Sequence, residues 1–287
     1  MAETPFFRKI TVVGVGLIGG SLGMAIKHHR MSHEVAGISQ RHTTLVYALK
    51  NKAIDRAYHD IRKAVYNSDL IILATPVNTI INLLKQIGPH LKRGSIVTDV
   101  GSTKLTIVDT AEKHLPPHVF FVGSHPLSGS EKQGASFANP NLFEKSLCLL
   151  TPTERSNRMA VEKLRQFWAR LGAQVKLMTP GEHDRILSFV SHLPHVVAFA
   201  LIGVIPHQYL EFASTGLKDT TRIASSAPQM WSDICLANSK NIIQALDETV
   251  KSLSLYRKLI IARDEQNLME NFKKAKAKRD GALEPAE

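Results

Sequence analysis

The sequence is poor in cysteine and in aromatic residues, and it has no long uninterrupted hydrophobic run. Only two of its 287 residues are cysteines and 6% are aromatic. Cys148 and Cys235 lie far apart in apolar surroundings, which favours buried, reduced thiols over a disulfide or a metal pair. No apolar run approaches the roughly 20 residues that cross a bilayer. The first residues also lack the basic and apolar regions of a secretory signal. We therefore expect a globular cytoplasmic protein without membrane contact.

Basic residues outnumber acidic ones, with 36 Lys and Arg against 25 Asp and Glu. Such an excess is typical of nucleic-acid binding, but the basic residues are scattered except in KKAKAKR at 273–279. A positive field would equally concentrate anionic small molecules around an enzyme. We predict no nucleic-acid partner, and we expect residues 273–287 to form a basic, disordered tail.

Short apolar runs alternate with amphipathic segments along the first 180 residues. The pattern predicts strands at 9–16, 33–39, 68–76, 94–102 and 119–126, and helices at 21–29, 78–91 and 103–114. Two more strands, at 145–152 and 173–180, flank a predicted helix at 158–172. Alternation at this pace predicts an α/β fold, a doubly wound Rossmann-type dinucleotide-binding domain over residues 1–179.

The pattern changes after residue 180. From Asp184 to Lys278 the apolar residues follow helical periods, and breaks fall at Pro194 and Pro206. We predict a second, all-helical domain over residues 180–272.

The stretch VVGVGLIGGSLG (12–23) joins the first predicted strand to the first predicted helix. Gly14, Gly16 and Gly19 fit G-x-G-x-x-G, a pattern that binds dinucleotides when it lies between a strand and a helix. The backbone N–H groups near Leu17 and Ile18 would then face the phosphates. A tight corner without a ligand is the alternative, and the surrounding elements argue against it.

The end of the second predicted strand bears on the choice of cofactor. An acidic residue about 20 residues after the turn would bind the ribose 2′-hydroxyl of NAD. This sequence has no acid there, but has instead Ser39, Gln40, Arg41 and His42. A hydroxyl beside a guanidinium suits a 2′-phosphate, so we predict NADP in preference to NAD, unless Arg41 is an ordinary exposed helix-entry residue. Thr75 and Pro76 are predicted to wall the nicotinamide ribose, with a plain loop as the alternative.

Three polar clusters lie where predicted strands end or helices begin, which is where a cleft between two domains would form. Together with the glycine turn they make the sequence resemble the prephenate/arogenate dehydrogenases of tyrosine biosynthesis. The resemblance runs in order from about residue 9 to about residue 231, through VVGVGLIGGSLG, DVGSTK, GSHPLSGSEKQG, LFEKSLCLLTPT, EHDRILSFVSHLPHVVAFAL and GLKDTTRIA. It implies oxidative decarboxylation of prephenate to 4-hydroxyphenylpyruvate, with hydride passing to a nicotinamide cofactor.

The resemblance assigns the catalytic roles. His125 corresponds to the base that takes the proton of the substrate's 4-hydroxyl, a task that neutral imidazole performs at physiological pH. Ser102 corresponds to the serine that hydrogen-bonds this hydroxyl and the histidine. By sequence alone Ser102 is equally an N-cap for a helix that begins at Thr103.

The resemblance also assigns the substrate-binding residues. Arg222 corresponds to an arginine that binds a substrate carboxylate, and a surface arginine paired with Asp219 is the alternative. Glu131 corresponds to an acid at the cleft entrance. Trp231 is expected to reach the neighbouring subunit's site in a homodimer of the helical domains, unless it is a helix-packing anchor. The second domain supplies His195 on the substrate's carboxylate side, with Ser191 and His192 supporting the wall.

Leu127 and Ser128 depart mildly from the family's pattern. His195 favours prephenate, and arogenate remains the alternative substrate. A β-hydroxyacid dehydrogenase would need a catalytic lysine on a helix of the second domain, and SHLPH argues against that class. A non-catalytic NADP-sensing module would account for the glycine turn but not for the clustering of polar residues after it. The histidines show no set of three ligands at metal-binding spacing, so we predict no metal.

Overall fold

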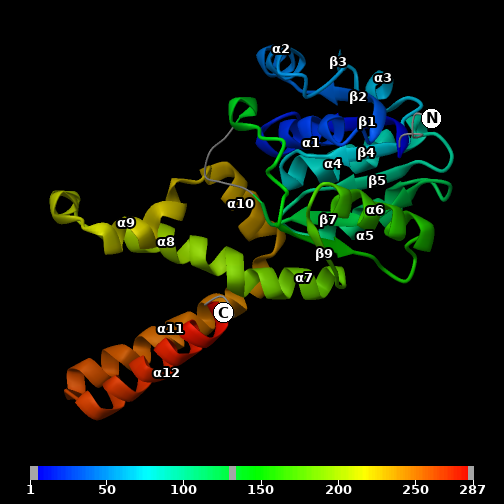
Figure 1. Ribbon diagram of the computed structural model, residues 1–287. Helices are drawn as coiled ribbons and strands as arrows, with labels where there is room; N and C mark the ends of the chain where they lie inside the picture. The colour runs from blue at the N-terminus through cyan, green and yellow to red at the C-terminus, as the bar shows by residue number, and fades with distance from the viewer. Residues whose placement is uncertain (1–5, 129–133, 284–287) are drawn as a thin grey trace. The chain divides into compact units, whose positions relative to one another are not determined.

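The computed structural model describes residues 6–128 and 134–283. Its first part is a six-stranded, all-parallel sheet in the order β3-β2-β1-β4-β5-β6 (Figure 1). The strands are β1 (Phe7–Val13), β2 (Ser32–Ile38), β3 (Arg56–Tyr58), β4 (Leu70–Leu73), β5 (Ile96–Asp99) and β6 (Phe120–Phe121). The strand order reverses between β1 and β4, as in dinucleotide-binding folds that hold their ligand at this point. The predicted doubly wound α/β fold is confirmed.

Helices enclose this sheet and bury apolar residues against it in two separate clusters. They are α1 (Leu17–His28), α2 (His42–Lys50), α3 (Ile61–Val65), α4 (Val77–Ile87) and α5 (Leu105–His114). Helix α4 buries Val77, Ile80, Leu84 and Ile87, a spacing that places all four on one face. The sequence analysis did not predict α2, β3 or α3. The last two have only three and five residues, and α2 buries only Leu45 and Ala48, so its apolar stripe is faint.

A second sheet of three strands follows, in the order β7-β8-β9, with β7 (Gly123–Pro126), β8 (Leu147–Thr151) and β9 (Gln174–Leu177). The prediction of one strand over 119–126 was therefore wrong, whereas the strands predicted at 145–152 and 173–180 both form, as β8 and β9 of this second sheet. The chain leaves the first sheet after β6, and β7 pairs antiparallel with β8. Gly123 permits this close pairing, because a Cβ at that position would lie 2.4 Å from Thr151 Oγ1. Helix α6 (Arg158–Arg170) follows β8 and packs on the first sheet's core.

The next segment is helical, in agreement with the prediction. It comprises α7 (Pro180–Leu187), a π-helical turn (Ser188–His192), α8 (Leu193–Gly203), α9 (Thr215–Thr221) and α10 (Pro228–Ala237). Thr179 and Glu182 form a capping box that starts α7. Pro194 has no N–H to donate and its ring crowds the carbonyl four residues earlier, which accounts for the widened turn before α8. Wide turns of this kind re-aim side chains, and here the turn carries Ser191 and His192.

The chain divides into two compact units, Met1–Ser239 and Lys240–Glu287. Helices α7 to α10 thus belong to the same compact unit as both sheets, although α7 begins at the predicted boundary near residue 180. The second unit is a pair of helices, α11 (Ser239–Ala262) and α12 (Glu265–Leu283) (Figure 1). Tyr256 stacks on Phe272 between them, with ring centroids 5.4 Å apart.

The expectation of a disordered tail from residue 273 was wrong for residues 273–283, which continue α12. Lysines and alanines favour helix, and oppositely charged pairs one turn apart support it. Glu270 pairs with Lys274 at 2.6 Å, and Lys276 pairs with Asp280.

Two other expectations need adjustment. Both cysteines are free as predicted, but Cys235 is only partly buried while Cys148 is fully buried. The continuous helical stretch Pro180–Gly203 is long and apolar enough to cross a membrane by length and composition alone. The prediction considered only uninterrupted apolar runs and so did not find it. One such helix is weak support for a membrane segment.

Candidate active site

His125 lies at one end of a buried polar chain. It sits on β7, is 8% exposed, and its Nδ1 lies 2.9 Å from Nε2 of His183 on α7. The other ring nitrogen of His183, Nδ1, lies 2.8 Å from Asp184 Oδ1. The second sheet and α7 thus bring His125 together with His183, which lies 58 positions later in the chain, and with the neighbouring Asp184.

Asp184 is itself fixed by the start of α5. Its Oδ1 accepts the Lys104 amide at 2.7 Å and its Oδ2 accepts the Leu105 amide at 2.9 Å. These amides belong to the first turn of the helix, where N–H groups have no partner within the helix and favour a carboxylate. Asp184 therefore caps α5 from another element. Ser102 does not cap this helix, because the helix begins at Leu105 rather than at Thr103 and its N-cap is Lys104.

A buried ion pair lies beneath this chain. Lys104 and Asp99 are both fully buried and form a salt bridge, and Lys104 Nζ also donates to the Ser124 carbonyl at 3.0 Å. Asp99 accepts the Gly101 amide at 2.8 Å. The Ser124 hydroxyl lies 2.6 Å from Thr98 Oγ1 and accepts the Trp168 indole N–H at 3.2 Å. Strand β7, which carries both Ser124 and His125, is thus held to β5 and α6 by polar contacts.

Burial controls the protonation of the two linked histidines. Burial, reinforced by His183, Lys104 and His192, holds the pKa of His125 well below 6.5. Burial also lowers the pKa of His183, although its bond to Asp184 opposes the shift. Burial disfavours the ionised form of Asp184, but the bonds from His183 and the Leu105 amide outweigh it and lower the pKa of this carboxyl. At neutral pH the chain therefore consists of two neutral imidazoles and one carboxylate.

A second cluster gathers His195, Trp231 and Arg222. The His195 ring stacks on the Trp231 indole with centroids 3.7 Å apart, and its Nδ1 donates to the Ser191 carbonyl at 3.0 Å. Burial is the main cause that lowers the pKa of His195, and the nearby positive charge of Arg222 adds to it. Trp231 is 7% exposed, so its ring is buried against His195 of its own chain, whereas we expected it to reach a neighbouring subunit. Arg222 is exposed in the turn after α9.

His192 lies between the two clusters. Its ring contacts Trp231 edge to face at 6.2 Å, and its Nδ1 accepts from the Asn238 amide at 3.1 Å. Burial lowers its pKa to about 4, against the opposing effects of Asp184 and the Ser102 backbone. The structure thus brings Ser102 next to His192 rather than to the start of a helix. Support of the substrate wall by His192 stays a prediction.

The glycine turn has the shape that a dinucleotide needs. Gly14 has a φ of +94°, and a Cβ there would lie 2.5 Å from the Ala74 carbonyl oxygen. A Cβ on Gly19 would lie 1.9 Å from the Gly14 carbonyl oxygen, so the helix packs directly on the turn. Gly16, by contrast, faces open space and is the N-cap of α1, without a side chain capping the helix. Uncapped amides at a helix start, beside open space, fit a pyrophosphate.

The other predicted cofactor residues lie at the carboxyl ends of neighbouring strands. Thr75 and Pro76 follow β4, and the Thr75 methyl group would be 2.7 Å from a Cβ on Gly14. Ser39, Gln40 and Arg41 follow β2, and the Arg41 amide donates to Ser39 Oγ at 3.3 Å. His42 begins α2 and stacks on His59, with centroids 5.6 Å apart. The structure therefore places both groups at the edge where the strand order reverses.

Several functional candidates were missed or cannot be placed. Sequence reasoning gave no role to His183 and Asp184 beyond a test for metal binding, nor to Lys104. The adjacent His and Asp at the start of the helical segment were the available signal for them. Glu131 lies outside the described residues. In the described ranges, no group of three or more His, Cys, Asp or Glu is arranged to hold a metal ion.

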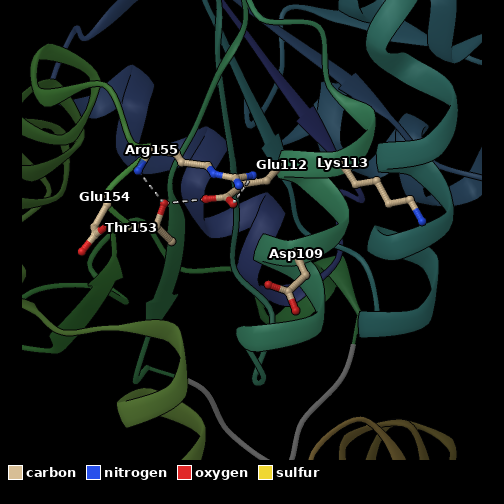
Figure 2. A pocket seen from close by; sticks show the side chains of 6 residues that line it. All are labelled: Asp109, Glu112, Lys113, Thr153, Glu154 and Arg155. Atoms are coloured by element: carbon tan, nitrogen blue, oxygen red, sulfur yellow. Dashed lines mark hydrogen bonds and ion pairs between the residues drawn. The ribbon is translucent and has the colours of Figure 1, made fainter.

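A separate surface hollow of about 570 Å³ lies between α5 and the loop after β8 (Figure 2). Its lining is charged and comprises Asp109, Glu112, Lys113, Thr153, Glu154 and Arg155. Glu112 is held there by Thr153 and by Arg155, whose Nη1 lies 3.5 Å from Glu112 Oε2. None of these residues belongs to the clusters around His125 or His195.

The dinucleotide turn together with a buried, neutral histidine defines a nicotinamide-dependent dehydrogenase. Comparison with known proteins identifies the family. A model described as prephenate dehydrogenase, nucleotide-binding domain, matches residues 22–177, and one described as prephenate dehydrogenase, dimerization domain, matches residues 179–274. The chain belongs to the prephenate dehydrogenase family.

Relatives of known structure or curated name agree with this family. Prephenate dehydrogenase of Bacillus subtilis (strain 168) is 37% identical over 279 residues, which are 95% of this chain and 75% of the relative. A prephenate dehydrogenase from Aquifex aeolicus, crystallised with hydroxyphenyl propionate and NAD⁺, gives a TM-score of 0.89 at 32% identity and covers 97% of this chain and 99% of its own. Synechocystis arogenate dehydrogenase gives 0.81 at 30% identity, covering 96% and 100%. These names leave open which substrate and which cofactor this chain prefers.

Proposed function

We propose that this protein catalyses the oxidative decarboxylation of prephenate to 4-hydroxyphenylpyruvate with NADP as hydride acceptor, in the cytoplasm, as a step of tyrosine biosynthesis. The observation that carries the proposal is the buried His125, whose Nδ1 is engaged by His183 at 2.9 Å. Nε2 is therefore the ring nitrogen left for a substrate. Because burial keeps this imidazole neutral, it is ready to accept a proton.

The chemistry follows from the substrate and the residues. Prephenate carries a hydroxyl on C4 of a cyclohexadiene ring, and His125 takes the proton of this hydroxyl as the C4–O bond gains carbonyl character. A nicotinamide cofactor held at the glycine turn would supply the acceptor for the hydride that leaves C4. Loss of the ring carboxylate as CO₂ then makes the ring aromatic, so the reaction is effectively irreversible. Ser102, next to His192, orients the hydroxyl.

The cluster around His195 suits an anionic side chain. Its Nδ1 is engaged by the Ser191 carbonyl, and the charge of Arg222 acts on the same ring. A guanidinium binds a carboxylate through two parallel bonds but repels an ammonium group. Prephenate has a keto group where arogenate has an ammonium, so this cluster favours prephenate. Trp231 fixes the His195 ring by stacking, and Glu131 is proposed to guide entry to the cleft.

The turn at Gly14, Gly16 and Gly19 would hold the cofactor, with the Leu17 and Ile18 amides toward its pyrophosphate. Thr75 and Pro76 would line the nicotinamide ribose. The 2′-phosphate of NADP would lie among Ser39, Gln40, Arg41 and His42, a group without acidic side chains. The proposed preference for NADP rests on this group.

Steady-state assays with purified protein test the function. Prephenate and arogenate are crossed with NADP and NAD, and the absorbance of the reduced nicotinamide is followed. We expect the highest kcat/KM for prephenate with NADP. A higher value for arogenate overturns the substrate assignment, and a higher value for NAD overturns the cofactor assignment. Binding of NADP without turnover of either substrate would indicate a sensing module.

Arg41→Ala is expected to raise the KM for NADP by about 10- to 100-fold, because it removes a charge-assisted bond to the phosphate. The KM for NAD, which lacks this phosphate, is expected to stay within about twofold. Lys50→Ala is the matched control, since Lys50 is an exposed cation at the other end of α2. Equal losses for both cofactors would mean that Arg41 does not recognise the phosphate.

We further propose that the protein is a homodimer through its helical segment. Helix α8 buries Ala198 but leaves most of its apolar residues partly exposed, and Val204 and Phe212 just beyond it are 76% and 78% exposed. A second copy would cover this surface and would explain why an apolar helix lies unburied in one chain.

Val204→Asp is expected to shift the protein from dimer toward monomer, because a carboxylate cannot be buried unpaired in an apolar interface. Light scattering coupled to gel filtration would measure the mass against the chain's 31.8 kDa. Met159→Asp serves as the control, since Met159 is an equally exposed apolar residue (80%) on α6. If both variants remain dimeric, the interface lies elsewhere.

A further inference from the structure

His125, His183 and Asp184 form a continuous hydrogen-bonded chain. Asp184, at one end, determines which nitrogen of each imidazole carries a hydrogen. Asp184 is the fixed point, because its two oxygens accept the Lys104 and Leu105 amides at 2.7 and 2.9 Å. A carboxylate in this position can only accept. His183 Nδ1, at 2.8 Å from Asp184 Oδ1, must therefore carry a hydrogen.

The hydrogen position on His183 in turn determines the one on His125. A neutral imidazole carries hydrogen on one nitrogen only, so His183 Nε2 is an acceptor. His125 Nδ1 lies 2.9 Å from it and must then be the donor. His125 Nε2 is left as a lone pair, which is the form that a base needs in order to take the proton of a hydroxyl.

We propose that His183 and Asp184 are positioning residues that lock His125 in its Nδ1-protonated form and stabilise the imidazolium that forms during turnover. The inference deepens the proposed function and rests on it. When His125 Nε2 gains the hydroxyl proton, the Nδ1–H bond to His183 strengthens, and Asp184 stabilises the positive charge through that ring. Hydride loss from C4 gives a dienone, loss of CO₂ moves electrons onto its oxygen, and this oxygen takes the proton back from His125 as the phenol forms. The imidazole is then neutral again, and no proton is released overall.

The other charged and titratable groups near His125 do not replace this chain. Lys104 Nζ is engaged by Asp99 and by the Ser124 carbonyl. His192 is held by Asn238 and is neutral, since burial lowers its pKa to about 4. Of the described groups that face His125, His183 is therefore the one that accepts its Nδ1–H, and it connects to a carboxylate that two helix amides hold in place.

Substitutions of His183 test the lock without disturbing the bonds from Asp184 to α5. A Gln side chain places Oε1 near the position of His Nε2, so His183→Gln keeps an acceptor for His125, whereas His183→Leu offers none. We expect kcat to fall about 10- to 100-fold in His183→Leu and clearly less in His183→Gln, with both KM values within about twofold. A role in packing alone predicts the reverse order, because Leu is the better buried residue. That order would overturn the proposal.

Asp184→Leu probes the fixed point. It removes the acceptor for His183 Nδ1, so no group determines which nitrogen of either ring carries the hydrogen. We expect kcat to fall about 10- to 100-fold, as in His183→Leu. The melting temperature reports separately on the lost cap of α5.

Histidine ¹⁵N chemical shifts provide a readout that does not depend on turnover. We expect His125 in its Nδ1–H form in the wild type, and in a mixture of its two neutral forms in both Asp184→Leu and His183→Leu. The Nε2–H form in the wild type overturns the lock even if the enzyme turns prephenate over. The Nδ1–H form in a protein that turns over neither substrate instead overturns the proposed function and leaves the lock standing.

Discussion

His125→Asn is expected to lower kcat by about 10²- to 10⁴-fold, the range that a positioned general base contributes. The amide nitrogen of Asn can take the place of imidazole Nδ1 and keep the bond to His183 that now spans 2.9 Å. It has no basic nitrogen for the substrate. The KM for the cofactor is expected to stay within about twofold, because the dinucleotide turn lies on other strands.

The pH profile separates this role from a structural one. A base must be neutral to accept a proton, and burial holds the pKa of His125 well below 6.5. Wild-type kcat/KM should therefore be level around pH 7 and fall only as the pH drops through this lowered pKa. In His125→Asn that fall should disappear from the residual rate.

His114→Asn is the matched control, because His114 is exposed at the end of α5. We expect wild-type kcat and an unchanged pH profile for it. If His125→Asn kept kcat within about threefold of the wild type, or retained the acid fall, His125 would not be the base. The melting temperature of both variants shows whether the fold is intact.

The sequence predicted the elements that carry long apolar runs or glycine signals. Strands β1, β2, β4 and β5, helices α1, α4, α5 and α6, and the helical nature of the segment after residue 180 all agree with the structure. The path after β6 was not predictable from local pattern, because residues 119–126 are apolar enough for one strand. What separates β6 from β7 is the pairing of Gly123 with Thr151, a contact between residues 28 positions apart.

The site shows the same division between local and long-range information. Motifs indicated His125, His195 and the glycine turn, because spacing within a motif is local. The partner of His125 was not indicated, since His183 reaches it only through the packing of α7 against the second sheet. Likewise DVGSTK was noted for Ser102, whereas the structure fully buries the Asp99–Lys104 ion pair of that motif.

Lys104→Met is expected to lower the free energy of unfolding by about 3–5 kcal/mol, the cost of leaving one member of a buried ion pair alone. Methionine matches the length of the lysine stem, so little packing is lost. Asp99, which is fully buried, keeps only the amides of Gly101 and Ser124 as partners. Urea titration of both proteins measures the difference.

The loss should shrink in acid. Burial already raises the pKa of Asp99 above 3.8, and Lys104 opposes that rise. Without the lysine, the folded state binds a proton at a still higher pH than the unfolded chain does. A group that binds protons more tightly in the folded state adds stability as the pH falls through its folded-state pKa. The variant should therefore recover part of its deficit as the pH falls below neutral, and a deficit that grows in acid would contradict this.

Two further variants separate burial from charge. Lys27→Met removes a partly exposed lysine from its ion pair with Asp55, and a solvent-screened pair of this kind is worth about 0–1 kcal/mol. Replacing both buried partners, as in Asp99→Leu with Lys104→Met, removes the unpaired charge, and such exchanges are often close to neutral. The double variant should therefore be more stable than Lys104→Met alone, although it loses the bonds to the Gly101 and Ser124 amides. If it is less stable, Asp99 contributes to the fold chiefly through those amides, and the pair with Lys104 is secondary.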